Sequence, residues 1–162
     1  KVQELGVLLF MHPQGAPGTT QNERLEGRGG LGNTIGNPLE TTVALSHMIF
    51  EGVFDRFPKL QIVLGHMGEN IPFHLWRSDH WFERRPEEYG SSLKPSEIFM
   101  RNFSVTTSGV EHGPALRYAL EVLDTTLPHD LKVVIIPLFD DLPTTQRLLP
   151  RLLSVLLVPF WT

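Results

Sequence analysis

The chain is 162 residues long, with 41% hydrophobic and 20% charged residues, the composition of a single globular domain. A closed eight-stranded α/β barrel usually needs roughly 250 residues, so these residues alone are too few for one. The net charge is −4 and no basic block stands out, which argues against a nucleic-acid partner. The absence of cysteine excludes disulfides and thiolate metal ligands, so any metal must be held by histidine and carboxylate. We expect a cytoplasmic protein.

Neither end of the chain has the pattern of a targeting segment or a membrane span. The first apolar run is short and no initiating Met precedes it, so we expect a chain that either begins inside a longer protein or is incomplete. Residues 142–162 are rich in leucine but are interrupted by Pro143, Pro150 and Pro159. We therefore divide the chain into a domain at 1–141 and a divergent tail at 142–162, with no membrane partner.

The first half of the chain alternates short apolar runs with longer periodic stretches. A strand is predicted at Val7–Met11, and residues 14–36, which hold seven glycines, are predicted to form a long surface loop. Asn37 is the expected N-cap of a helix that runs to about Phe57, with Glu40 closing a capping box. The residues predicted to face inward from this helix are Leu39, Val43, Ile49 with Phe50, and Val53 with Phe54.

The same rhythm continues in the second half. Leu60–Leu64 is apolar at nearly every position, as in a parallel strand that is covered on both faces, and a helix is predicted from Glu69 to Glu83. Phe103–Thr107 is the third predicted strand, Pro114–Leu123 its helix, and Leu131–Ile136 the fourth strand. Strands alternating with helices indicate parallel βα units. The predicted fold class is α/β, as about four units of an incomplete (β/α)8 barrel.

Two histidines fall where predicted strands end. His12 closes the first strand and His66 the second, so parallel neighbouring strands would bring both imidazoles to one rim, where side chains of βα folds gather. Either histidine alone is as readily explained as a structural residue bonded to backbone. Together, and with Glu69 three residues after His66, they favour an active site in which the carboxylate orients the imidazole. Taken alone, Glu69 could simply complement a helix dipole.

The other polar groups give weaker evidence of a functional site. His74 and His80 do not share a helix face, which argues against a metal site on that helix. Trp76 and Trp81 are interpreted as core or interface aromatics. The segment 106–109 offers hydroxyls at the third strand end but lacks the glycine-flanked serine of a hydrolase elbow. No dinucleotide or phosphate-binding motif is present.

One long block resembles a known family. The run from Gly52 to Phe73, continued by Leu75-Trp76-Arg77 and His80-Trp81-Phe82-Glu83, is similar to the metal-dependent decarboxylase branch of the amidohydrolase superfamily. That branch includes dihydroxybenzoate, resorcylate and aminocarboxymuconate-semialdehyde decarboxylases. The resemblance extends from about Val7 to Leu123. It also takes in His12-Pro13, Glu40-Thr41-Thr42, Gly65-His66-Met67-Gly68-Glu69 and Thr106-Thr107-Ser108-Gly109.

The resemblance implies a distorted (β/α)8 barrel and one divalent ion, which can be zinc, manganese or magnesium. It implies that His12 is a ligand of that ion. His66 and Glu69 correspond to residues that serve proton transfer and substrate positioning, and Arg77 is similar to an arginine that helps to hold the acidic substrate. A small-molecule carboxylic acid and a homo-oligomeric partner are expected.

Two departures from the family pattern leave the function open. The family's first strand carries a Glu-x-His metal pair, which has no counterpart from Lys1 onward, and its late-strand Asp corresponds to apolar residues around Ile136. The leading hypothesis is a non-oxidative carboxy-lyase acting on a small hydroxylated aromatic or related unsaturated acid. One alternative is a truncated, catalytically inactive fragment or interaction module. Another is a metal-dependent hydrolase of the same superfamily.

Overall fold

The computed structural model describes residues 1–12, 25, 28–107, 109–110, 112–115, 117–118 and 133–134. The strands within these residues form one sheet in the order β1-β2-β3-β4, and each strand is parallel to its neighbour. The strands are β1 (Leu8–Met11), β2 (Gln61–Leu64), β3 (Phe103–Thr106) and β4 (Val133–Val134). The predicted parallel βα arrangement is therefore present.

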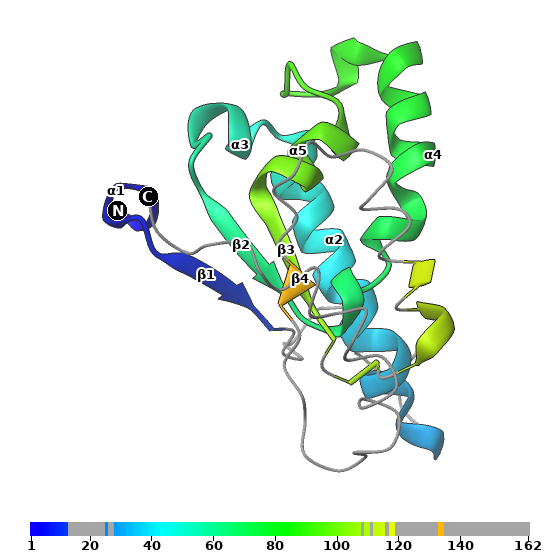
Figure 1. The fold of residues 1–162 in the computed structure, drawn as a ribbon. Coiled ribbons are helices and arrows are strands. Elements are labelled where there is room, and N and C mark those ends of the chain that lie inside the picture. The colour runs from blue at the N-terminus through cyan, green and yellow to red at the C-terminus, as the bar shows by residue number, and fades with distance from the viewer. Residues whose placement is uncertain are drawn as a thin grey trace.

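The α-helices of the described residues are α1 (Val2–Leu5), α2 (Asn37–Phe50), α3 (Val53–Arg56), α4 (Ile71–Arg84) and α5 (Pro95–Asn102). Shorter turns are the 3-10 helices η2 (Arg28–Gly30), η4 (His66–Gly68) and η5 (Pro86–Glu88) and the π-helix η3 (Gly32–Gly36). Figure 1 shows β1 at the edge of the sheet, with α2 and α4 on the same side of it. Among the described residues no helix is long and apolar enough to cross a membrane.

The strand register aligns the carboxyl ends of the first three strands. Met11 is opposite Leu64, and Leu64 is opposite Val105. The residues that follow β1, β2 and β3 consequently leave the sheet at one edge, where ligands bind in parallel βα folds. This alignment places the predicted histidines on a common rim.

The core lies between the sheet and the helices that cover it. Ile62 and Leu64 on one face of β2 and Val63 on the other are all buried, as expected for a strand covered on both faces. Ile98 of α5 is fully buried in the same cluster as Ile62 and Leu64. Leu45 of α2 and Leu75 of α4 complete the same cluster. Burial of each such side chain contributes about 1.5–3 kcal/mol to folding, so this cluster holds the strand ends in place.

The inward face of α2 differs from the prediction. Leu39 and Val43 are 36% and 42% exposed, whereas Thr41, Leu45 and Ile49 are buried. Leu39 and Thr41 are two positions apart, which is a rotation of about 200°, so Leu39 and Val43 lie nearly opposite Thr41 and Leu45. Ile49, which is also predicted to face inward, is buried as predicted. The predicted face is wrong at Leu39 and Val43, which are apolar but exposed.

The start and end of α2 also differ from the prediction. Asn37 is not an N-cap but a helical residue, since the π-helix η3 leads directly into α2 and the Asn37 N–H bonds to the carbonyl of Gly32. No capping box forms at Glu40 because that turn is not a helix start. The helix ends at Phe50, and α3 is separate, because Gly52 adopts a φ of +71° against the backbone of Gly90.

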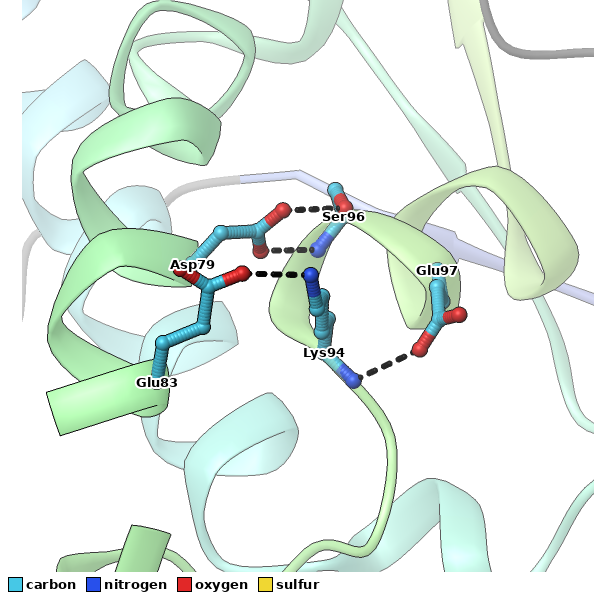
Figure 2. A network of polar contacts seen from close by, with 5 residues as sticks. All are labelled: Asp79, Glu83, Lys94, Ser96 and Glu97. Carbon is cyan, nitrogen blue, oxygen red and sulfur yellow. Dashed lines mark hydrogen bonds and ion pairs between the residues drawn. The ribbon is translucent and has the colours of Figure 1, made fainter. Parts of the chain in front are cut away.

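The helix α5 is absent from the sequence prediction, and its first turn is held from outside the helix. Asp79 of α4 accepts hydrogen bonds from the backbone N–H (2.9 Å) and the hydroxyl of Ser96, as Figure 2 shows. Glu97 accepts from the Lys94 backbone N–H at 2.9 Å, and the Lys94 ammonium pairs with Glu83. Such bonds satisfy N–H groups that a helix start leaves without partners. Asp79 is therefore a structural group that joins α4 to α5.

Several predicted elements are described only in part. Residues 114, 115, 117 and 118 of the helix predicted at 114–123 are helical, and two residues of the fourth predicted strand pair with β3. The tail at 142–162 and the segment around Ile136 lie outside the described residues. The domain boundary at 141 stays a prediction.

Candidate active site

The strand register brings the two predicted histidines into contact. The ring centroids of His12, which follows β1, and His66, which follows β2, are 5.8 Å apart, and the rings meet edge to face at 69°. Both imidazoles stand at the carboxyl edge of the sheet, as the sequence predicts. Their proximity is set by the pairing of β1 with β2 rather than by any local motif.

The turn after β2 is unusual in its backbone. His66, Met67 and Glu69 all have positive φ angles, of 53°, 59° and 56°. Met67, with a ψ of 26°, is in the left-handed helical conformation, which costs a non-glycine residue roughly 1–2 kcal/mol. Glu69, with a ψ of −128°, lies in another sparsely populated region, so packing must hold this turn. Met67 is 6% exposed and belongs to the core cluster, which anchors the turn between the two polar residues. Backbone strain of this kind concentrates at functional sites.

Glu69 is the buried acid of the site. Glu69 is only 8% exposed, and its Oε1 lies 3.9 Å from Nε2 of His66. Within the described part of the chain, this oxygen accepts no hydrogen bond. Burial raises the pKa of Glu69, and the charges of His66 and His12 oppose that rise without cancelling it. Glu69 is therefore an acid that holds its proton to a higher pH than an exposed glutamate.

A cavity of about 280 Å³ opens beside His66 and Glu69. One wall contains Phe73 of α4, whose ring stacks on Tyr118 with the centroids 4.2 Å apart and the planes 3° from parallel. Asn70 and Thr34 add polar groups. The remaining lining residues are Ile35, Pro38, Leu39, Met67, Val110 and Ala115. The result is a mostly apolar space with a histidine and an acid in its wall, and its volume suits a small ligand.

Several cavity residues are absent from the sequence prediction. Thr34 and Ile35 lie in the segment 14–36, which is predicted to be a surface loop, and Leu39 is predicted to face the core. Phe73 and Tyr118 are separated by 45 positions, so only the fold brings them together. The one available signal is the position of Asn70 and Phe73 directly after the Gly65–Glu69 motif.

The remaining predicted residues lie elsewhere. Arg77 is exposed on α4 and does not line the cavity, so its role toward substrate stays a prediction. Trp76 is 77% exposed and stacks on His80, with the ring centroids 5.3 Å apart, so it is not a core residue. Trp81 is 46% exposed and donates a hydrogen bond to Glu88.

The described residues supply part of a metal site. His12 and His66 offer two imidazoles, and the unbonded buried oxygen of Glu69 lies beside them. However, the described residues contain no group of three histidine, aspartate or glutamate side chains placed to hold an ion. A complete shell of the kind usual for a catalytic zinc ion has three protein ligands. The described residues therefore do not fit a whole metal site by themselves.

Comparison with known proteins places the chain in a family. The family model described as amidohydrolase matches residues 1–127, which is most of the chain. The chain belongs to the amidohydrolase family. A gamma-resorcylate decarboxylase from Rhodococcus jostii is 40% identical over 114 residues, which cover 67% of this chain and 34% of that protein. The chain spans about a third of the length of the curated relatives that it matches.

Solved structures of amidohydrolase-family decarboxylases share the fold. The 5-carboxyvanillate decarboxylase of Sphingomonas paucimobilis superposes with a TM-score of 0.71 at 37% identity, covering 98% of this chain and 46% of that one. A dihydroxybenzoic acid decarboxylase from a Polaromonas species was solved with manganese and 2-nitroresorcinol. It superposes with a TM-score of 0.70 at 31% identity, and the match covers 88% of this chain and 41% of that one. The resemblance to the decarboxylase branch and the fold class of an incomplete α/β barrel are confirmed.

Proposed function

We propose that this chain carries one side of the active site of a metal-dependent, non-oxidative decarboxylase for a small hydroxylated aromatic acid. The observation that carries the proposal is the meeting of His12, His66 and the buried Glu69 at the carboxyl edge of a parallel sheet, next to an apolar cavity. The names of the relatives support the same reaction class, since those proteins are decarboxylases of resorcylate, dihydroxybenzoate and carboxyvanillate.

In the proposed reaction an aryl carboxylate takes up one proton and releases carbon dioxide. The bond between the ring and the carboxyl carbon breaks, its electron pair stays on the ring carbon, and a proton is delivered to that carbon. Glu69 is suited to hold this proton because burial raises its pKa, and His66 lies 3.9 Å from it. A positioned acid of this kind contributes roughly 10²–10⁴-fold to a rate.

The cavity supports an aromatic substrate. Phe73 and Tyr118, whose rings are stacked face to face, both line the cavity, and Leu39 and Ile35 supply further apolar surface. A planar ring buries its faces well against such walls, while Asn70 and Thr34 can hydrogen-bond its hydroxyl groups. Its volume of about 280 Å³ favours a single-ring acid over a larger ligand.

A bound divalent ion would polarise the substrate carboxylate and a neighbouring oxygen as a Lewis acid. His12 is the residue that we propose as its ligand in this chain. Two solved relatives with bound manganese support a divalent ion. The described residues do not supply a complete shell, so no step of the reaction is assigned to the ion.

Three further assignments are proposals from the sequence. Arg77 binds the acidic substrate, the chain forms a homo-oligomer, and the protein is cytoplasmic. The exposed aromatic rings of Trp76 and Phe73, at 77% and 60%, are compatible with a subunit contact. A mass measurement in solution tests the oligomer, and an Arg77→Lys variant that keeps its KM for the acid contradicts the role of Arg77.

The function is tested by carbon dioxide release. The protein is incubated with manganese or zinc and a panel of monohydroxy- and dihydroxybenzoates, alongside His66→Ala and the exposed-residue control His47→Ala. We expect turnover of at least one 2-hydroxylated acid, a loss of roughly 10²-fold or more in His66→Ala, and wild-type turnover in His47→Ala. Equal activity in wild type and His66→Ala contradicts the proposal.

A second candidate, a catalytically inactive relative that serves as an interaction module, is favoured by one observation. Within the described residues no three-ligand metal group is assembled. That candidate predicts neither stoichiometric metal nor carbon dioxide release, so elemental analysis of the same preparation separates the two. Hydrolase activity, the third candidate, predicts water addition to an ester or amide without loss of carbon dioxide.

A further inference from the structure

We propose that Gly109 is a positioning residue for His66, whose imidazole packs directly on the bare Cα of residue 109. Gly109 follows β3, whereas His66 follows β2, so the two turns meet at the carboxyl edge of the sheet. The proposal deepens the proposed function and rests on it for its catalytic consequence. The contact itself is tested without turnover.

The distances leave no room for a side chain at position 109. A Cβ built on Gly109 would lie 2.7 Å from Nδ1 and 3.1 Å from Cε1 of His66. Distances under 3.0 Å essentially never occur for real Cβ atoms, so the ring would have to move. The Nδ1 edge of the imidazole thus packs against the backbone of residue 109, which limits how far the ring can move in that direction.

The other edge of the ring faces the acid. Nε2 of His66 lies 3.9 Å from Oε1 of Glu69, and the His12 ring meets the imidazole edge to face. A displacement of the ring away from residue 109 therefore changes its distance to Glu69, or to His12, or to both. Gly109 sets how the imidazole is presented to its two polar neighbours.

The position of Gly109 is fixed by a hydrogen-bonded turn. The Val110 N–H donates to the Thr107 carbonyl at 3.1 Å, which closes a turn around Gly109 directly after β3. Within this turn Gly109 has a φ of +72°, a conformation that favours glycine. Two separate requirements therefore select glycine here, the backbone angle and the contact with His66, and a test must separate them.

Gly6 is the matched control. Its φ of +64° carries the same backbone preference, but a Cβ added there would meet nothing within 4 Å. Gly6→Ala therefore reports the cost of the left-handed angle alone. Gly109→Ala reports that cost together with the displacement of His66.

The decisive readout is the imidazole of His66 in NMR spectra of the full chain, assigned by the signal that disappears in His66→Ala. We expect nuclear Overhauser contacts between the residue 109 Hα and the His66 ring in wild type and in Gly6→Ala. In Gly109→Ala we expect shifted His66 ring signals and altered contacts to the Glu69 side chain and the His12 ring. Ring signals and contacts in Gly109→Ala that match those of Gly6→Ala overturn the proposal.

Thermal unfolding gives a second test, which does not require an NMR spectrum of the folded Gly109→Ala variant. We expect Gly109→Ala to lower the Tm more than Gly6→Ala does, and this excess to disappear in the His66→Ala background, where the imidazole is absent. A Gly109→Ala chain that folds only when combined with His66→Ala supports the proposal. An excess loss of the same size in both backgrounds, or a double variant that fails to fold, overturns it.

Discussion

The imidazole rings of His12 and His66 meet edge to face with their centroids 5.8 Å apart, although they come from different strands. The register that pairs Met11 with Leu64 puts the two residues on the same rim. The proximity of the histidines is therefore a property of the parallel sheet. Any change that shifts β1 against β2 is expected to separate the rings before it unfolds the core, because β1 lies at the edge of the sheet.

Replacing Glu69 by glutamine is expected to stabilise the fold at neutral pH. Burial raises the pKa of Glu69, so ionisation costs folding free energy once the pH exceeds the value of an unfolded glutamate, about 4.3. The free energy of unfolding of the wild type falls as the pH rises from the unfolded pKa through the folded pKa of Glu69, whereas that of Glu69→Gln does not. We expect a gain of about 1 kcal/mol or more at pH 8 that vanishes near pH 4, measured by urea unfolding.

The exposed Glu51, which pairs with His47 on the surface of α2, provides the control for that experiment. Glu51→Gln is expected to change the unfolding free energy by less than about 0.5 kcal/mol at either pH. A Glu69→Gln variant that is equally destabilised at pH 4 and pH 8 contradicts the pKa assignment. If the proposed function holds, the stabilised Glu69→Gln protein is also the one that loses turnover.

Asn102 is expected to be among the most sensitive polar positions in the described residues. It is fully buried, and its Nδ2 donates to the carbonyls of Pro58 at 3.0 Å and Leu60 at 2.7 Å, which joins the end of α5 to the start of β2. Asn102→Ala leaves the buried Leu60 carbonyl without its donor and is expected to cost about 2–3 kcal/mol. Asn102→Asp keeps the size of the side chain but removes both N–H donors, and it is expected to cost at least as much. An Asn102→Asp variant with the same free energy of unfolding as wild type contradicts this prediction.

The capping of α5 by α4 predicts a contrast between two acids that lie four residues apart. Asp79 accepts from the Ser96 backbone N–H, so Asp79→Ala is expected to destabilise the protein by about 1 kcal/mol. Glu83 pairs with Lys94 at the surface, where solvent screens the ion pair, so Glu83→Ala is expected to destabilise the protein much less than Asp79→Ala. Chemical denaturation of both variants tests the contrast, and equal effects would show that the cap adds nothing beyond a surface ion pair.

Asp55 gives a prediction with the opposite pH dependence to Glu69. Burial alone would raise its pKa, but hydrogen bonds from Ser91 and Ser92 and the charge of Arg101 outweigh burial and lower it. A lowered pKa means that the stabilisation is present above about pH 3.9 and is lost as the pH falls through the folded value. Because Asp55 is exposed and solvent screens its interactions, Asp55→Asn is expected to be only about 0.5 kcal/mol less stable than wild type at pH 7, with the gap closing at acid pH in thermal melts. A gap that is constant from pH 3 to pH 7 would refute the prediction.

The strands can be predicted from the sequence because their signal is local. The run at β2 is apolar at nearly every position, and a strand covered on both faces needs that composition whatever surrounds it. Once β1 and β2 are parallel neighbours, the shared rim of His12 and His66 follows from chain direction alone. The relative placement of the two site histidines is therefore predictable from the strand pattern, and the observed contact between their rings confirms it.

Features that depend on distant contacts cannot be predicted in this way. The helix α5 is short, and its first turn is held by Asp79 of another helix, so its own sequence carries only part of the signal. The buried face of α2 includes Thr41 and Leu45 but not Leu39, which is as apolar as Leu45 and lines the cavity instead. The burial of Glu69 and the contact of Gly109 with His66 likewise arise only when separate turns converge on one edge of the sheet.

We propose that His66 and Glu69 protonate a substrate carbon as carbon dioxide leaves. The most direct measurement is the release of labelled carbon dioxide from 2,6-dihydroxybenzoate that carries ¹³C in its carboxyl group, with added manganese. The account predicts labelled carbon dioxide and resorcinol in equal amounts, with a deuterium on the ring when the reaction runs in D₂O. Formation of both products is expected to fall by roughly 10²-fold or more in His66→Ala and in Glu69→Gln. Release that persists unchanged in both variants, or its complete absence from the manganese-loaded wild-type chain, contradicts it.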